Sequence, residues 1–136
     1  MCIRYRSSTV TEKVSEVSAI NVVRDSMVQV QREIADNIDC VLEGRDIGTV
    51  VFPNADFKFF LVAGLKIRAL RRQKDLNKIG EKKTIDEIKT DIRLRDELDT
   101  NRDNSPLLKA KDAIEIDTGL LSIGEQIDKI VSIIKQ

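Results

Sequence analysis

The sequence predicts an α/β fold in which parallel strands alternate with helices. Short apolar runs bounded by glycine, proline or asparagine are typical of strands, and longer segments with apolar residues at three- and four-residue steps are typical of helices. These patterns occur in the order helix, then strands and helices, then a strand and a helix. Residues 57–63 are apolar almost throughout, which favours a strand covered on both faces, as in parallel sheets.

A long helix over residues 10–36 is the first predicted element. Its apolar residues recur at helical spacing, and they are Val10, Val14, Val17, Ile20, Val23, Met27, Val30 and Ile34. Thr9 and Glu12 have the spacing of a capping box at its start, and Asn21 marks a bend. We therefore expect one amphipathic helix that changes direction near its middle.

Three short runs predict strands. They are residues 38–44 (IDCVLEG), 57–63 (FKFFLVA) and 113–117 (AIEID). Asn37 and Gly44 bound the first run, and Gly48 and Pro53 punctuate the loop that follows it. The alternation of these runs with helical segments predicts that the strands are parallel.

Three later helices have recognisable ends. Residues 65–79 form a helix rich in arginine and lysine that Gly80 ends. Capping-box spacing starts the other two helices, at Thr84 with Glu87 and at Ser122 with Glu125. The last helix carries Ile123, Ile127, Ile130, Val131 and Ile134 at helical spacing.

The composition indicates one globular domain. The chain has 136 residues, of which 41% are hydrophobic and 34% are charged, so it can bury a modest core. Basic and acidic residues balance at 23 each, which does not favour long-range attraction to nucleic acid or to a membrane. The two cysteines, Cys2 and Cys40, make no disulfide framework, which favours a reducing compartment such as the cytoplasm.

The absence of histidine narrows the chemistry. The sequence has no histidine, which excludes Ser-His-Asp catalysis, Cys-His catalysis and a histidine-ligated metal within this chain. Phosphoryl transfer needs none of these, because it relies on positioning, on arginine and lysine, and on magnesium held by oxygen atoms. All eleven arginines lie between Arg4 and Arg102, so an anion site is expected in the first three quarters of the chain.

The tripeptide Gly44-Arg45-Asp46 directly follows the first predicted strand. Ligands of open α/β sheets bind outside the carboxyl ends of the strands. At that place Arg45 could hold a phosphate with its forked guanidinium, and Asp46 could accept hydrogen bonds from a base or a sugar. A glycine turn with a local ion pair would explain the same three residues.

Arg95, Asp99 and Arg102 are spaced i, i+4 and i+7. On a continuing helix all three side chains point to one side, where the carboxylate could orient two guanidinium groups toward an anion. Ordinary ion pairs on a solvated helix face would have the same spacing. Ser15 and Arg24 lie on the long first helix, and nothing local marks either as more than a surface residue.

One predicted helix is strongly basic. Its positive residues are Lys66, Arg68, Arg71, Arg72 and Lys74. A mobile lid over a nucleotide has this character, and so does a surface helix that is balanced by acidic neighbours.

Together these segments resemble the bacterial cytidylate kinases, a branch of the nucleoside monophosphate kinases. The resemblance covers nearly the whole chain, and several motifs in the right order are more specific than any one of them. The matching segments are YRSSTV, VSEVSAINVVRDSMVQVQRE, GRDIGTVVFPNADFKFFLVA, RALRRQ, IRLRDELDTNRDNSPLLKAKDAIEIDT and LSI.

The resemblance implies a site for CMP. By this likeness Arg45 binds the phosphate of CMP, Asp46 faces the cytosine, and Ser15 and Arg24 help to read the base. These roles rest on the matching motifs of the family and not on spacing alone.

The same resemblance implies roles for the later arginines. Arg95 and Asp99 hold the sugar hydroxyls, and Arg102 also contacts the substrate. Arg45, Arg95 and Arg102 are thereby implied to be catalytic. Arg71 and Arg72 lie at the lid that closes over ATP.

The resemblance also implies a P-loop NTPase-like fold with three layers, in which helices flank a parallel sheet. Residues 1–36 then belong to the substrate-binding insertion and its long helix, and residues 37–136 form the core with a lid at 64–100. The family begins with a strand and a G-x-x-x-x-G-K-[ST] loop that holds the phosphates of ATP, and this sequence contains no such motif. The expected fold is therefore incomplete.

The implied activity is phosphoryl transfer from ATP to CMP or dCMP, with Mg²⁺, giving CDP or dCDP. Without the phosphate-binding loop we expect this chain alone to be impaired. Two alternatives remain at this stage, a non-catalytic CMP-binding remnant and a fragment that complements a separate P-loop piece. The resemblance implies a cytoplasmic monomer with no nucleic-acid or membrane partner, and no residue is predicted as a metal ligand.

Overall fold

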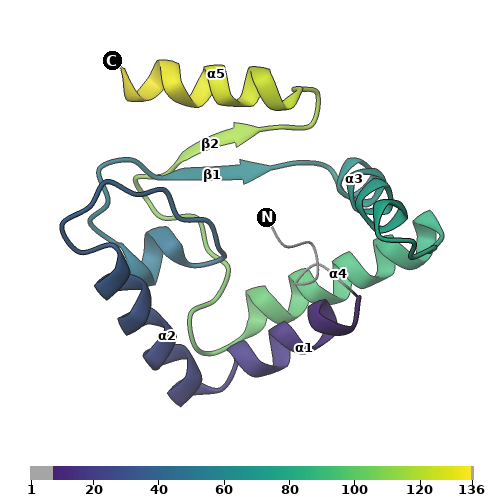
Figure 1. Cartoon of the computed structure of the whole chain (residues 1–136), viewed down its shortest axis with the longest axis horizontal. Helices are drawn as coiled ribbons and strands as arrows, with labels where there is room; N and C mark the ends of the chain where they lie inside the picture. Colours follow the sequence, from purple (N-terminus) through teal and green to yellow (C-terminus); the bar gives the residue numbers. More distant parts are fainter. Residues whose placement is uncertain (1–7, 136) are drawn as a thin grey trace.

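The computed structural model describes residues 8–135 and has an α/β fold (Figure 1). Its elements in chain order are α1 (Ser8–Ser18), α2 (Asn21–Ile34), the wide single turn η2 (Ile47–Val51), β1 (Phe59–Val62), α3 (Leu65–Lys78), α4 (Ile85–Asn101), β2 (Ile114–Asp117) and α5 (Ile123–Ile134). The predicted fold class is thus confirmed. No helix among the described residues is both long enough and apolar enough to cross a lipid bilayer.

The sheet of the described chain consists of β1 and β2, which run parallel. Phe59 pairs with Ile114 and Leu61 with Ile116. The ladder continues past the carboxyl ends of the strands, where the Thr118 amide donates to the carbonyl of Val62 at 2.8 Å. The predicted strands at 57–63 and 113–117 are confirmed, and α3 and α4 form the crossover between them, as a parallel pair requires.

The predicted strand at 38–44 is wrong, because the structure has a loop there (Figure 1). Among the described residues, the backbone of residues 38–45 makes no hydrogen bond to another backbone group. The side chain of Val41 is fully exposed, although it lies in the middle of an apolar run. A strand exists only through pairing with a neighbour, and within residues 8–135 β1 pairs only with β2. The apolar pattern is that of a strand, but no neighbour pairs with it among the described residues.

The predicted long helix is divided into α1 and α2. Ile20 has an extended backbone with φ −77° and ψ 115°, so the helical hydrogen bonds stop before Asn21. Asn21 begins α2, and its side-chain oxygen accepts a hydrogen bond from the Asn104 side chain at 3.0 Å. The change of direction predicted at Asn21 is therefore a break that a distant loop holds in place. The side chains of Thr9 and Glu12, the predicted capping box, lie outside the described ones.

A small core joins α3 to α4. Ala69, Leu76 and Ile88 are buried against one another, and Ile79, Ile85 and Ile92 pack around them. Full burial of Leu76 and of Ile88 contributes roughly 1.5–3 kcal/mol each. The predicted caps are confirmed at both helices, because Thr84 with Glu87 and Ser122 with Glu125 form complete capping boxes.

Gly80 ends α3 in the predicted way. It has a left-handed φ of 79°, and the amide of the next residue, Glu81, donates to the carbonyl of Leu76 at 3.0 Å. This arrangement satisfies a carbonyl that the end of the helix leaves unpaired. The glycine is required here because a β-carbon is strained at this φ.

We predict that Gly80→Ala lowers the free energy of unfolding by about 1 kcal/mol. Gly124→Ala is the matched control, because a β-carbon at Gly124 meets nothing within 4 Å and its φ is not left-handed. The control should leave stability unchanged or raise it slightly. Urea unfolding followed by circular dichroism measures both, and equal effects of the two substitutions would contradict the role of the backbone conformation.

Candidate functional site

The candidate site is a cluster of four arginines around two buried aspartates. Asp46 and Asp99 are only 2% and 3% exposed, so both carboxylates have left bulk water. Burial of a carboxylate is unfavourable unless it is paired and hydrogen-bonded. Each aspartate therefore has an arginine partner, and these pairs hold together segments that are distant in the sequence.

Asp46 joins the loop after residue 44 to α2. Its main-chain carbonyl accepts from the amides of Val50 at 2.8 Å and Thr49 at 3.2 Å, which closes the turn η2. Its side chain accepts a hydrogen bond from Arg24 of α2. The turn fixes the backbone, and the ion pair aims the carboxylate at α2.

Asp99 joins the same loop to α4. Its Oδ2 accepts from Nε of Arg45 at 2.8 Å, and Nε of Arg95 lies 3.7 Å from the same oxygen. The main-chain carbonyl of Asp99 accepts from the amide of Leu107 at 2.7 Å, which fixes the chain beyond α4. The predicted i, i+4 contact of Arg95 with Asp99 is confirmed. It is not a pair on a solvated helix face, because the carboxylate is buried.

Arg102 reaches the cluster by a different route from the predicted one. The expected continuing helix ends at Asn101, and Arg102 is its C-cap with an extended backbone. Nε of Arg102 donates to the carbonyl of Ser105 at 2.5 Å, and Ser105 has a left-handed φ of 54°. A tight turn therefore carries Arg102 toward α2 instead of the i+7 helical position.

The electrostatics of the cluster favour an anion. Burial lowers the pKa of Arg24 below its ordinary value, and the positive charge of Arg102 lowers it further. Burial also lowers the pKa of Arg95, the charge of Arg45 adds to this effect, and Asp99 opposes it. Four guanidinium groups around two carboxylates leave a formal surplus of two positive charges. A dianion in the cluster would balance this surplus.

The same arginines have hydrogen-bond donors to spare. Nε of Arg24, Nε of Arg95 and Nη2 of Arg102 are buried and have no hydrogen-bond partner among the described residues. Leaving such a donor unpaired costs about 1–3 kcal/mol. These donors are suited to oxygen atoms of a ligand, since guanidinium groups bind phosphate and carboxylate in defined geometry.

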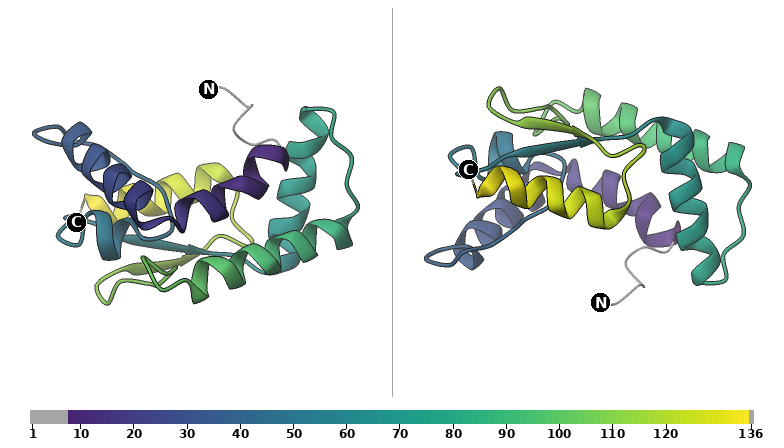
Figure 2. Two further views of the ribbon diagram at one scale, coloured as in Figure 1. Left: turned by 90° about the horizontal axis from the view of Figure 1, so that it is seen from below. Right: turned by 90° about the horizontal axis from the view of Figure 1, so that it is seen from above.

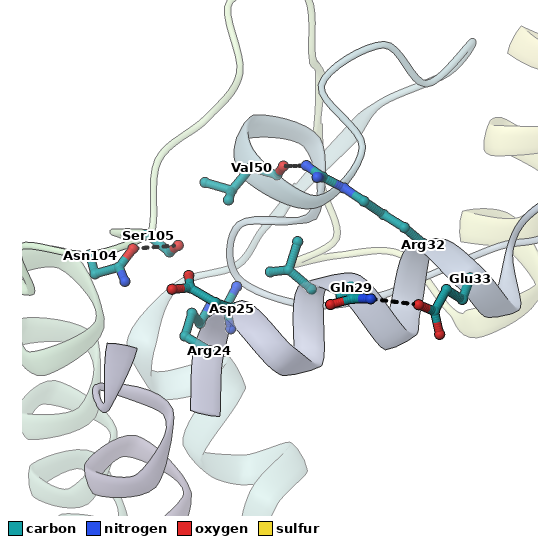
Figure 3. Close-up of a pocket in the computed structure, with 9 residues that line it drawn as sticks. Arg24, Asp25, Gln29, Arg32, Glu33, Val50, Asn104 and Ser105 are labelled. Atoms are coloured by element: carbon teal, nitrogen blue, oxygen red, sulfur yellow. Dashed lines mark hydrogen bonds between the residues drawn. The ribbon is translucent and has the colours of Figure 1, made fainter. Parts of the chain in front are cut away.

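An open hollow of about 530 Å³ lies beside the cluster, between α2, η2 and the loop at 104–105 (Figure 3). It is lined by Arg24, Asp25, Val28, Gln29, Arg32, Glu33, Val50, Asn104 and Ser105. Arg32 spans from α2 to η2, where its Nη2 donates to the carbonyl of Val50 at 2.8 Å. The volume of the hollow is in the usual range for small-molecule sites. Arg24 belongs to both the hollow and the cluster.

The two predicted lid arginines, Arg71 and Arg72, make different contacts. Arg71 donates through Nη2 to the carbonyl of Thr118 at 2.5 Å and through Nη1 to its hydroxyl at 3.1 Å. It therefore holds α3 against the carboxyl ends of the strands. The charge of Arg72 lowers the pKa of Arg95, which puts it near the cluster. The side chain of Ser15, on α1, lies outside the described ones.

Two features of this region were not predicted. Thr118 is 4% exposed and links α3, β1 and β2, since its hydroxyl also donates to the carbonyl of Val62 at 3.0 Å. Arg68 of α3 pairs with Asp96 of α4 through two hydrogen bonds of 3.2 and 2.5 Å. The position of Thr118 just after an apolar strand was the signal for the first. No local pattern in the sequence marks the second.

The described side chains form no metal site of their own. Among the side chains that the structure describes, no three acidic, cysteine or histidine residues come together in a group that could hold a metal ion. No chemical step is therefore assigned to Mg²⁺ in this chain.

Comparison with known proteins decides the family. The family model for cytidylate kinase matches residues 3–136. The chain belongs to the cytidylate kinase family. Among curated relatives, the cytidylate kinase of Halalkalibacterium halodurans is 48% identical over 133 residues, which are 98% of this chain and 60% of that protein.

Other members of the cytidylate kinase family give the same result. The cytidylate kinase of Lactobacillus johnsonii is 46% identical over 134 residues, covering 98% of this chain and 58% of that protein. That of Thermosipho melanesiensis is 52% identical over 114 residues, covering 84% of this chain and 52% of that protein. The chain thus spans somewhat more than half the length of the curated relatives it matches.

We predict that Asp99→Asn lowers the free energy of unfolding by about 2 kcal/mol, because it leaves Arg45 and Arg95 without a countercharge. Added inorganic phosphate should recover part of this loss by supplying the missing negative charge. Asp86→Asn is the control, because the Asp86 side chain is 91% exposed in a surface pair with Lys89. Thermal unfolding with and without phosphate measures the effect, and equal losses in both variants would contradict it.

Proposed function

We propose that this chain forms the acceptor side of a cytidylate kinase and binds CMP or dCMP. The observation that carries the proposal is the surplus of two positive charges in a cluster with unpaired guanidinium donors. A phosphomonoester carries up to two negative charges at neutral pH, so its phosphate matches this surplus. Arg45 binds that phosphate, and Arg102 contacts the substrate beside it.

The two aspartates have distinct roles in this proposal. Asp46 faces the cytosine with Arg24 and Ser15, since a carboxylate accepts a hydrogen bond from the exocyclic amine of cytosine. Asp99 and Arg95 hold the sugar hydroxyls. Arg45, Arg95 and Arg102 then neutralise charge as the acceptor phosphate attacks the γ-phosphorus of ATP. The chain supplies this acceptor side, and Arg71 and Arg72 lie toward the donor.

We expect the purified chain to bind CMP and to transfer little or no phosphate from ATP. The sequence contains no G-x-x-x-x-G-K-[ST] loop, and such a loop grips the donor phosphates. A coupled assay for nucleoside diphosphate tests whether the chain transfers phosphate from ATP. Robust turnover of CMP and ATP by the 136-residue chain would overturn it.

Calorimetry with CMP tests the site directly. Arg45→Ala should weaken CMP binding about 10- to 100-fold, because it removes a charge-assisted hydrogen bond worth roughly 1.5–3 kcal/mol. Arg93→Ala is the control, as Arg93 is an exposed arginine of the same helix that carries Arg95 and Asp99. UMP should bind more weakly than CMP, since its carbonyl oxygen meets the carboxylate of Asp46. Absence of any heat with CMP would remove the proposal.

A second possible function is to complete a kinase together with a separate polypeptide that carries the P-loop. The loop at 38–45 favours this function. Val41 is fully exposed and β1 pairs on one side only among the described residues, so the sheet can accept a further apolar strand. Co-expression supplies the test. The partner is the part of the Halalkalibacterium halodurans protein that lies outside its match to this chain. CMP kinase activity should appear only when both pieces are present, and no rescue counts against this function.

A further inference from the structure

One arginine of α2 binds the C-terminal end of the turn η2. Nε of Arg32 donates to the carbonyl of Val51 at 2.9 Å, and its Nη2 donates to the carbonyl of Val50 at 2.8 Å. Figure 3 shows this side chain reaching from α2 to Val50. The carbonyls at the end of a helical turn have no partner inside the turn. The forked guanidinium group therefore supplies partners for two successive carbonyls of η2.

The opposite end of η2 carries the buried carboxylate of Asp46. Asp46 directly precedes the turn, and its main-chain carbonyl also accepts a hydrogen bond from the hydroxyl of Thr49 at 3.3 Å. Wide helical turns of this kind are rare and often occur at functional sites. Because η2 has only five residues, a shift of its C-terminal end would also displace Asp46.

The turn η2 lies beside α2 and is bound to it at both ends (Figures 1 and 2). Arg24 pairs with Asp46 at the start of the turn, and Arg32 binds the carbonyls at its end. Val28, the buried residue of α2, lies midway between the two arginines in the sequence, so all three are on one side of the helix. One contact alone would let η2 pivot about it, whereas two contacts fix its direction.

We propose that Arg32 is a positioning residue for recognition of the base. It holds η2 against α2 and thereby keeps the carboxylate of Asp46 where the exocyclic amine of cytosine can donate to it. This inference rests on the proposed CMP site, in which Asp46 faces the cytosine. The phosphate side should not depend on Arg32, because Asp99 of α4 holds Arg45 there.

Calorimetry with CMP and UMP tests this role. Arg32→Ala should weaken CMP binding about tenfold, the effect of losing one well-placed hydrogen bond, and should leave the binding of UMP and of inorganic phosphate unchanged. Arg93→Ala is the matched control, since Arg93 is an exposed arginine of α4, and it should alter neither nucleotide's affinity. An equal loss of CMP and UMP binding would indicate general destabilisation and would overturn the positioning role.

A double-mutant cycle tests whether Arg32 acts through Asp46. In an Asp46→Asn background, Arg32→Ala should not change the ratio of CMP to UMP affinity, because the carboxylate that Arg32 positions is already absent. A further fall in the ratio would overturn the proposed route. If circular dichroism shows that Arg32→Ala does not fold, Arg32→Lys takes its place, since lysine keeps the charge but lacks the fork.

Amide hydrogen exchange without nucleotide separates this inference from the CMP site. The amide of Val50, which donates to the carbonyl of Asp46, should exchange about tenfold faster in Arg32→Ala. The amide of Ile88, which donates to the carbonyl of Thr84, should be unaffected. If the unmodified chain binds no CMP, the proposed function fails, and faster exchange at Val50 still supports the hold of Arg32 on Asp46. Unchanged exchange at Val50 overturns that hold, whatever the result with CMP.

Discussion

The ion pair between Arg45 and Asp99 is the interaction on which the site depends. It joins the loop after residues 38–44 to the last turn of α4, segments that are 54 positions apart in the sequence. Asp99 is buried, so loss of either charge would leave the other one poorly compensated. Because Arg95 shares the same carboxylate, three charged groups from two segments take one arrangement. The neighbouring Arg24–Asp46 pair extends this arrangement to α2.

Much of the fold could be predicted because its elements carry local signals. The capping boxes at Thr84 and Ser122 and the helix end at Gly80 depend on residues a few positions apart, and these three predictions are confirmed. The strand at 38–44 was wrong because strand pairing is not local. The apolar pattern shows only that these residues favour an extended conformation. They form a strand only where a neighbouring strand supplies hydrogen-bond partners. The break at Ile20 likewise depends on contacts with a distant loop, which a helical pattern does not reveal.

The candidate site was predictable to a similar degree. The family resemblance identified the residues that meet in the cluster, and the i, i+4 spacing explains why Arg95 meets Asp99. The i, i+7 spacing places Arg102 on a continuing helix, whereas α4 ends at Asn101, so the route of Arg102 was missed. It also did not predict that Arg71 binds Thr118, because that contact depends on how α3 packs against the ends of the strands.

The parallel sheet has a consequence for the order of folding. Phe59 pairs with Ile114, and the whole of α3 and α4 lies between these strands in the sequence. Closing that long loop is entropically unfavourable before any strand contact stabilises it. The α3–α4 core, which joins Ala69, Leu76 and Ile88, needs a much shorter loop. The helical hairpin is therefore the natural nucleus, and the β1–β2 ladder forms late, once that hairpin has brought its two ends together.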